Sequence, residues 1–319
     1  MRHDNLFKLA TAIALSIIFT GGLFYTTFEL PYILDKLLHN YFPDVFWQPG
    51  LREQMIETIR PYGYLSLTIT LALILIGFIT RKGYLSILGS VSLYLPIFGY
   101  FAYTMFFLAG LGILRVLWLP LSELSPIILN LGYIVYLPFL PLLASQNLSS
   151  MMPLIAFAVM WIGLLTFSFG VITWLYGKFK GCKVIDFWIY RYSRHPQYLG
   201  FLLWSYGLLL FVGFKPYIRG AFATPPTFIW LVSSMIVIGV ALYEEMEMKK
   251  KYGKEYEHYC KRTPFMLPLP GTLSKFIVLP LRSLMRWPPK SEKDIVAALI
   301  TYLVIFIVLS YLLLLILEA

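Results

Sequence analysis

The stretch MMPLIAFAVMWIGLLTFSFGVITWLY, residues 151–176, decides the class of fold. It contains no Asp, Glu, Lys or Arg, and it is longer than the roughly 20 residues that a helix needs to cross about 30 Å of hydrocarbon. Its apolar residues are continuous and do not alternate with polar ones, so the stretch predicts a membrane-spanning helix and not a strand of a barrel.

Similar apolar runs recur along the whole chain. The composition agrees, since 59% of the residues are hydrophobic, 13% are charged and the mean hydropathy is +0.74, which is too apolar for an ordinary soluble domain. We therefore predict an all-α, polytopic transmembrane helical bundle of about eight membrane helices. The predicted spans are residues 6–28, 62–80, 85–109, 124–144, 151–176, 198–214, 226–246 and 295–317.

The first run lacks a small-residue cleavage site, so we expect it to remain as a helix and not to act as a signal peptide. Residues 110–125 carry Arg115, Pro120 and Glu123 in an apolar setting, which indicates a broken or re-entrant helix. The predicted organisation has three parts: N-terminal membrane helices of unknown role in residues 1–150, a domain with a cytosolic basic segment in residues 151–294, and a last transmembrane helix in residues 295–319.

Positive charge is concentrated in residues 177–294, which hold 18 Lys or Arg against 8 Asp or Glu, whereas the rest of the chain holds 8 of each. By the positive-inside rule this region should face the cytoplasm, beside anionic headgroups. No nucleic-acid motif accompanies the charge, so we expect no nucleic-acid partner. The only cysteines, Cys182 and Cys260, predict no disulfide framework, and no C-x-x-C or H-x-x-x-H spacing supports a metal site.

The stretch YRYSRHPQYLG, residues 190–200, leads into the sixth apolar run. Pro196 suits the first turn of a helix, where its missing N–H costs nothing. A helix N-terminus favours an anion, and Arg191 and Arg194 add mobile positive charge beside it. Gly200 leaves room for a ligand or for a neighbouring helix.

Aromatic side chains surround this motif and offer flat faces for a purine or a sulfonium cation: Trp188, Tyr190, Tyr192 and Tyr198. A small zwitterion that carries both groups is S-adenosylmethionine, which is the cofactor we predict. The same residue types also gather at membrane edges without any function, through snorkelling and the aromatic belt.

The stretch YEEME, residues 243–247, ends the following run, where acidic groups near hydrocarbon are costly unless they are paired or used. Two i,i+4 pairs in the favourable Glu-to-Lys order predict a solvated helix end: Glu245 with Lys249, and Glu247 with Lys251. Glu244 remains, and its carboxylate suits ribose hydroxyls, an amino group or a sulfonium charge.

The stretch KYGKEYEHYCKRTP, residues 251–264, starts as helix and carries Gly253 as a break. If the helix continues through Gly253, Tyr252, Tyr256 and Tyr259 share one face. That face would cover the cofactor.

The order of the clusters, R-H-P-x-Y-x-G before a helix, E-E after the next helix, then Y-G-x-x-Y-x-x-Y, resembles the isoprenylcysteine carboxyl methyltransferase and phospholipid methyltransferase superfamily over about residues 170–270. The resemblance implies a cytosol-facing pocket for S-adenosylmethionine and an acceptor that enters from the bilayer. By similarity, the cofactor-binding candidates are Arg194, His195, Pro196, Tyr198, Gly200, Glu244 and Glu245, and the neighbouring Tyr190 and Tyr256 add aromatic faces.

The chain departs from the superfamily pattern at residues 181–190, which lack the His and the later Gly that usually precede R-H-P. Residues 251–260 are also similar to NADPH-dependent sterol reductases. The pairs Glu244-Glu245 and Gln197-Tyr198 favour the transferase over the reductase.

We therefore predict a membrane methyltransferase that uses S-adenosylmethionine and acts on a lipid-like or prenylated acceptor. The catalytic candidates are Glu244 and, for orienting an isoprenylcysteine-type carboxylate, Arg191 or Arg262. A phospholipid amine as the acceptor would instead need a base, for which His195, His258 and Glu244 are available. A thiolate acceptor would need no base. The other open alternatives are the reductase and a non-catalytic membrane scaffold or transporter.

Overall fold

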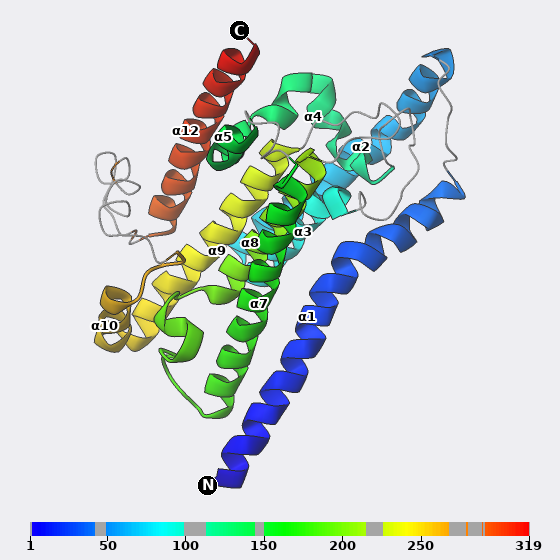
Figure 1. The fold of residues 1–319 in the computed structure, drawn as a ribbon. Helices are drawn as coiled ribbons and strands as arrows, with labels where there is room; N and C mark the ends of the chain where they lie inside the picture. The colour runs from blue at the N-terminus through cyan, green and yellow to red at the C-terminus, as the bar shows by residue number, and fades with distance from the viewer. Residues whose placement is uncertain are drawn as a thin grey trace. The chain divides into compact units, whose positions relative to one another are not determined.

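The computed structural model describes residues 2–41, 49–98, 113–143, 150–214, 226–267, 279, 289 and 291–318. These residues are helical or lie in connections, with no strand among them (Figure 1). The α-helices are α1 (Arg2–His39), α2 (Pro49–Ile79), α3 (Gly83–Phe98), α4 (Leu119–Leu124), α5 (Leu140–Leu143), α7 (Met152–Phe179), α8 (Pro196–Phe214), α9 (Thr227–Tyr252), α10 (Lys254–Arg262) and α12 (Glu292–Glu318). The 3₁₀ helices are η2 (Ile113–Trp118), η3 (Pro126–Asn130), η4 (Tyr133–Phe139) and η5 (Trp188–Arg191).

Six helices in the described part of the chain are long and apolar enough to cross a membrane, by length and composition. They are His3–Leu34, Ile56–Ile79, Met152–Phe179, Pro196–Gly213, Thr227–Tyr252 and Glu292–Leu317. A bent pair, Val116–Leu124 with Ile127–Leu142, counts as a seventh if it is one span. The third predicted run, residues 85–109, corresponds to the shorter apolar helix Gly83–Ile97, and its remainder, residues 99–109, lies outside the described residues.

The prediction of an all-α, polytopic bundle is therefore confirmed, and the chain is a multi-pass membrane protein. The predicted break in residues 110–125 is also confirmed for its described part, since the bent pair turns by 104° there. The reason is local, because Pro126 starts the next helical segment at the bend and cannot donate a backbone hydrogen bond to a helix that would continue through it.

The chain divides into two compact units, each of which draws on three segments. Unit 1 comprises Met1–Leu23, Ala158–Ser205 and Ile238–Tyr302. Unit 2 comprises Phe24–Phe157, Tyr206–Val237 and Leu303–Ala319. The predicted division into residues 1–150, 151–294 and 295–319 stays a prediction.

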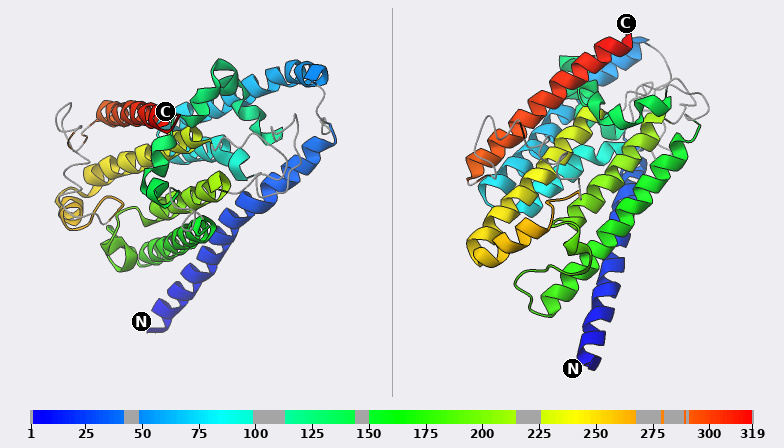
Figure 2. Two further views of the ribbon diagram at one scale, coloured as in Figure 1. Left: turned by 45° about the horizontal axis from the view of Figure 1, so that its top comes forward. Right: turned by 60° about the vertical axis from the view of Figure 1, so that its left-hand side comes forward.

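In unit 1, helices α7 and α8 lie side by side because glycines remove the side chains between them (Figure 2). A Cβ atom on Gly163 would lie 2.8 Å from the carbonyl oxygen of Gly200, and one on Gly200 would lie 2.6 Å from the Cα atom of Phe167. A Cβ atom on Gly170 would lie 3.0 Å from the backbone nitrogen of Gln197. Small residues permit this approach in membranes, where van der Waals contact drives helix association. The packing fixes the start of α8 against α7.

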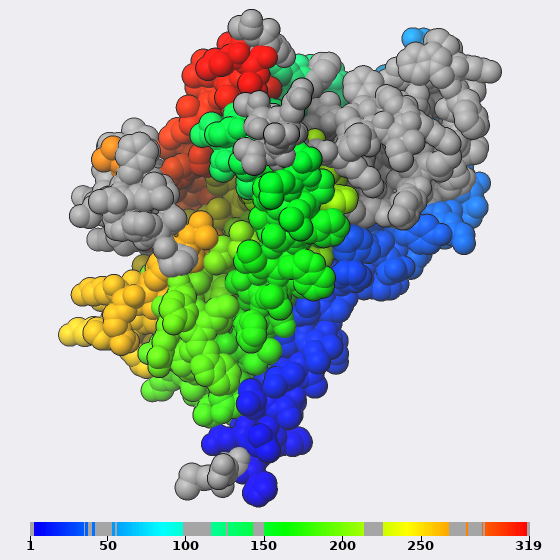
Figure 3. Space-filling view, in the orientation of Figure 1, coloured from blue at the N-terminus to red at the C-terminus, as the bar shows by residue number. Residues whose placement is uncertain are grey.

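The first part of α1 also packs on α7 within unit 1 (Figure 3). Ala12 belongs to a buried cluster with three residues of α7, namely Val171, Leu175 and Tyr176. The hydroxyl of Ser16 donates a hydrogen bond of 2.9 Å to the carbonyl oxygen of Ser168. Phe7 and Ile17 remain largely exposed, as apolar side chains that face lipid should be.

In unit 2, polar bonds hold the broken segment to its neighbours. The Nε of Arg60 on α2 lies 2.8 Å from Oε1 of Glu123 on α4. The indole N–H of the buried Trp118 donates to the carbonyl oxygen of Leu93 at 2.9 Å. The hydroxyl of Ser90 on α3 donates to the carbonyl oxygen of Ser233 on α9 at 3.0 Å. These bonds give Glu123 a structural partner.

The α7–α8 contact generates a stability prediction. We expect Gly163→Ala to destabilise the protein by about 1–3 kcal/mol, because an added methyl group in a packed interface forces backbone shifts. Thermal unfolding in detergent measures the effect. Gly21→Ala on α1 is the control, since nothing lies within 4 Å of a Cβ atom at that position. An unchanged melting temperature for Gly163→Ala would contradict the packing described above.

Candidate active site

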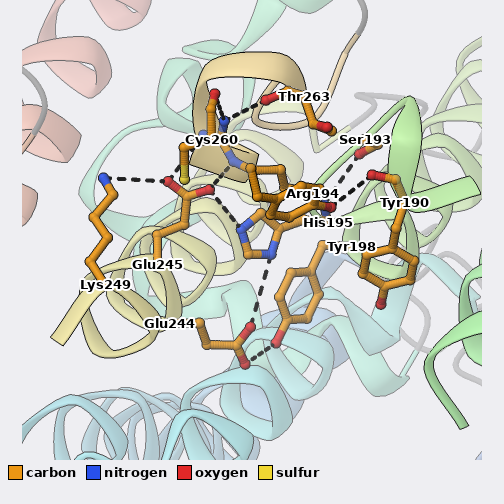
Figure 4. A network of polar contacts seen from close by, with 11 residues as sticks. Tyr190, Ser193, Arg194, His195, Tyr198, Glu244, Glu245, Lys249, Cys260 and Thr263 are labelled. Carbon is orange, nitrogen blue, oxygen red and sulfur yellow. Dashed lines mark hydrogen bonds and ion pairs between the residues drawn. The ribbon is translucent and has the colours of Figure 1, made fainter. Parts of the chain in front are cut away.

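The site lies in unit 1, where the start of α8 meets the end of α9 (Figure 4). Helix α8 begins at Pro196, as predicted. The backbone N–H of His195 donates to the Ser193 hydroxyl at 3.3 Å, and the His195 carbonyl accepts from the Leu199 N–H at 2.9 Å. This turn holds the side chains of Arg194 and His195 toward α9.

Arg194 and Glu245 form a two-pronged ion pair. The Nε of Arg194 donates to Oε1 of Glu245, and its Nη2 donates to Oε2 at 3.1 Å. The Arg194 and Glu245 side chains are only 11% and 6% exposed. A fork-to-fork pair is geometrically specific, and its removal from water makes the loss of either partner costly.

The same guanidinium also binds backbone carbonyls in the last turn of α10 and directly after this helix. Its Nη1 donates to the carbonyl oxygen of Cys260 at 2.9 Å and to that of Thr263. The backbone N–H of Arg194 donates to the carbonyl oxygen of Pro264 at 3.1 Å. One residue thus joins the start of α8, the end of α9 and the segment after α10.

Arg194 remains charged in this environment. Burial by itself would lower the pKa of its guanidinium, but the charge of Glu245 and the hydrogen bonds to it outweigh burial and raise the pKa above the usual value. The ion pair therefore does not dissociate by loss of the arginine proton at any physiological pH. The prediction that Arg194 carries a mobile charge is wrong, because its side chain donates four hydrogen bonds to groups within the protein.

His195 lies between the two glutamates. Its side chain is 8% exposed, and Nδ1 is 3.9 Å from Oε2 of Glu244. Nε2 is 3.4 Å from Oε1 of Glu245, close enough for electrostatic attraction but without hydrogen-bond geometry. Within the described residues, this buried nitrogen therefore has no hydrogen-bond partner. It is a polar atom that a ligand or water can satisfy.

Glu244 differs from its neighbour because its side chain is 49% exposed. The hydroxyl of Tyr198 donates to Oε1 of Glu244 at 2.6 Å, and the Tyr198 ring is stacked near His195 with centroids 5.8 Å apart. Adjacent positions on one helix thus serve two purposes. Glu245 is bound to Arg194, whereas the Glu244 carboxylate stays half exposed beside the rings of Tyr198 and His195.

Three buried tyrosines line the inner side of this cluster. The hydroxyl of Tyr259 donates to the carbonyl oxygen of Tyr190 at 2.7 Å, and the Tyr256 and Tyr259 rings lie 5.8 Å apart. Burial raises the pKa of all three phenols, so they are neutral at physiological pH. They can donate hydrogen bonds but do not supply a phenolate.

The other predicted residues lie apart from these contacts. Gly200 faces Phe167 of α7, so the missing side chain serves helix packing, the second of its two predicted uses. Arg191 and His258 are exposed. Arg262 is 3.5 Å from Asp186, and the two side chains are 58% and 50% exposed, respectively. No group of three or more potential metal ligands occurs in the part of the chain that the structure describes.

The predicted pair of Glu245 and Lys249 is present, at 4.0 Å. Glu245 is nevertheless buried and its main partner is Arg194, so the prediction of a solvated helix end is wrong for this residue. Glu247 pairs with Lys250 at 2.8 Å instead of Lys251. The helix rotates Glu245 inward and leaves Glu247 outside, a difference that charge spacing alone does not reveal.

The predicted break at Gly253 is confirmed, because α9 ends at Tyr252 and α10 begins at Lys254. Tyr252 therefore does not continue the helical face of Tyr256 and Tyr259, which are both buried. Sequence reasoning missed the carbonyl groups of Cys260 and Thr263 and the ring of Phe265, which lies 5.1 Å from His195. For Phe265, the available signal in the sequence was the apolar pair Pro264-Phe265 directly after a charged helix.

Comparisons with known proteins agree with this geometry. Residues 148–255 match the phospholipid methyltransferase family. A probable protein-S-isoprenylcysteine O-methyltransferase from Oryza sativa subsp. indica is 33% identical over 86 residues, which are 27% of this chain and 41% of the relative. Protein-S-isoprenylcysteine O-methyltransferase B from Arabidopsis thaliana is 31% identical over 86 residues, 27% of this chain and 40% of the relative.

The similarity is thus confined to part of each protein, and the chain spans about two fifths of the length of these relatives. No solved structure matches the chain. The matched segment contains the R-H-P turn and both glutamates. The resemblance to the superfamily of isoprenylcysteine carboxyl and phospholipid methyltransferases is confirmed.

The buried ion pair generates the second prediction. We expect Glu245→Gln to lower the free energy of unfolding by about 3 kcal/mol, because Arg194 would keep its buried charge and lose its counter-charge. Unfolding in detergent, followed by circular dichroism, measures the loss. Glu247→Gln is the matched control, since the Glu247–Lys250 pair is exposed and should contribute less than about 0.5 kcal/mol. Equal effects for the two variants would refute the distinction.

Proposed function

We propose that this protein is an S-adenosylmethionine-dependent methyltransferase that acts on a lipid-like acceptor. The observation that carries the proposal is the meeting of His195, Tyr198 and Glu244 at one place, with Glu244 half exposed and Nε2 of His195, 3.4 Å from Glu245, without a hydrogen bond in the described part of the chain. The match of this same segment to a methyltransferase family supports it.

The residues present fit the chemistry of this cofactor. The carboxylate of Glu244 can accept hydrogen bonds from ribose hydroxyls or an amino group, and it complements a sulfonium cation. The stacked rings of His195 and Tyr198 offer a flat contact for adenine. Arg194 is already engaged with Glu245, so we assign it to holding the site and not to binding the cofactor's carboxylate.

When bound, the cofactor supplies a methyl group on a cationic sulfur that an acceptor atom can attack in line. The protein's own contribution is position, because alignment of acceptor and methyl carbon supplies a large part of the rate gain. Tyr198 orients the Glu244 carboxylate through its hydrogen bond of 2.6 Å. The rigid Arg194–Glu245 pair keeps the two helices at the spacing this contact needs.

Cofactor binding is the direct test. We expect the purified protein to bind S-adenosylmethionine and S-adenosylhomocysteine in calorimetry but not NADPH, and we expect Glu244→Gln to weaken binding about tenfold, the loss of one charge-assisted hydrogen bond. Glu247→Gln serves as the control and should bind like the parent. Binding of NADPH alone would favour a reductase, and binding of none of the three would favour a non-catalytic scaffold or transporter.

For the acceptor, we propose an isoprenylcysteine-type carboxylate, because the relatives described above bear that activity in their names. The exposed Arg191 and Arg262 are the candidates for orienting it. The family that matches is named for phospholipids, so a phospholipid amine is the second candidate. An amine acceptor must lose a proton, and His195 and Glu244 are then the groups near enough to the site to take it.

The two acceptors predict different kinetics. With a farnesylcysteine analogue, we expect Arg262→Ala or Arg191→Ala to raise KM about tenfold with little change in kcat. The contact with the carboxylate stabilises the bound substrate and the transition state equally, so its loss weakens binding without slowing the chemical step. Arg262→Lys should retain part of the affinity. If instead only a phosphatidylethanolamine-type amine is methylated and both arginine variants keep the parental KM, the carboxylate assignment fails.

The excess of positive charge in residues 177–294 supports an orientation in which this site faces the cytoplasm. A lipid-like acceptor would then reach the site from the inner leaflet. Membrane lipids and this acceptor are the partners that we propose.

A further inference from the structure

Residues 253–265, here called the strap, fold back from the end of α9 onto the R-H-P turn. Helix α10 forms most of the strap, with Tyr256 and Tyr259 buried and Lys254, Glu255 and Lys261 exposed. A nine-residue helix is too short to be stable by itself in water. The position of the strap therefore depends on its links to the rest of unit 1. All but three of its residues lie beyond the segment that matches the methyltransferase family.

Gly253 forms the break between α9 and α10 at the start of the strap. Its backbone has φ +51° and ψ −126°, a conformation open to glycine and strained for residues with a Cβ atom. Nothing lies within 4 Å of a Cβ atom built at this position. Gly253 is therefore needed for its backbone conformation and not for space.

Arg194 holds the other end of the strap, and this set of hydrogen bonds is called the latch below. Three hydrogen bonds from this residue reach the carbonyl oxygens of Cys260, Thr263 and Pro264, while the remaining prongs hold Glu245. The Arg194 guanidinium also lies 5.8 Å from the Phe265 ring. Apart from Arg194, two polar contacts join the strap to residues 186–190: the Tyr259 hydroxyl donates to the Tyr190 carbonyl oxygen, and Arg262 pairs with Asp186.

The strap covers the histidine of the site. Phe265 lies edge-on to the His195 ring, and His195 is 8% exposed in this position. Its Nε2 has no hydrogen-bond partner in the part of the chain that is described. This nitrogen lies 3.4 Å from Oε1 of Glu245 without a hydrogen bond, so it is a buried polar atom that a ligand or water can satisfy.

We propose that the strap is a lid that turns at Gly253, is latched by Arg194 and opens to admit a ligand to His195. The identity of that ligand as S-adenosylmethionine rests on the proposed function. Arg194 is then a positioning residue, because it acts on the ligand through the strap and through Glu245 without touching the reacting atoms.

Cys260 is a natural reporter of the lid, because it lies in the strap and Cys182 is the only other cysteine. Its thiol is partly buried, and burial raises the pKa of the thiol, so alkylation should be slow while the strap is closed. The experiment measures the rate of Cys260 alkylation by N-ethylmaleimide in the full chain carrying Cys182→Ser, in detergent, with and without S-adenosylhomocysteine.

We expect Arg194→Lys to raise the alkylation rate about tenfold, since lysine keeps the charge but cannot form the fork. S-adenosylhomocysteine should slow the alkylation of the variant again by closing the lid over the ligand. Lys250→Ala, which removes an exposed ion pair on the neighbouring helix, should leave the rate unchanged. A melting curve for each variant confirms that it is folded at the labelling temperature.

Gly253→Ala provides a second route if Arg194→Lys folds poorly. It should also raise the rate, whereas Gly181→Ala, at another glycine with positive φ (+72°) and open surroundings, should not. If Arg194→Lys and Gly253→Ala are both folded and Cys260 is alkylated at the parental rate in each, the lid proposal is wrong. If the variants are alkylated faster but S-adenosylhomocysteine has no effect, the roles of Gly253 and Arg194 in holding the strap are supported. That result would show that the strap does not close over this cofactor.

Discussion

The buried pair of Arg194 and Glu245 is the interaction on which the site depends. Both side chains have left water almost completely, and an isolated charge in that environment would be prohibitively costly. The pair is tolerated because the guanidinium and the carboxylate match in two bonds and because backbone carbonyls take two further N–H groups. Its specificity lies in geometry, which joins three segments that are distant in sequence.

This constraint explains how two neighbouring glutamates come to differ. Glu245 is committed to structure, so Glu244, one residue earlier on the same helix, is left half exposed between Tyr198 and His195. The close approach of α7 and α8 through Gly163 and Gly200 fixes the other wall. A rigid frame that presents one half-exposed carboxylate beside two aromatic rings is a suitable arrangement for a cofactor that must be held accurately.

Much of this arrangement could be predicted from the sequence, and the failures have identifiable causes. Continuous apolar runs are sufficient to predict helices in a membrane. Pro196 marked a helix start because proline lacks the backbone N–H that a helix interior needs, and Gly253 marked a helix break because glycine adopts positive φ without strain. The role of Glu245 could not be predicted, since charge spacing offered Lys249 as a partner and only tertiary packing turns the side chain toward Arg194. The carbonyl acceptors at Cys260 and Thr263 leave no mark in side-chain chemistry at all.

A double-mutant cycle between Arg194 and Glu245 tests the central claim most directly. The free energies of unfolding of Arg194→Met, Glu245→Gln and the double variant are compared with that of the parent in the same detergent. If the pair organises the site, the two single losses exceed the loss in the double variant by about 2–3 kcal/mol, because the second change removes an orphaned charge. Losses that add to within about 0.5 kcal/mol would mean that the two residues act independently, and the account would fail.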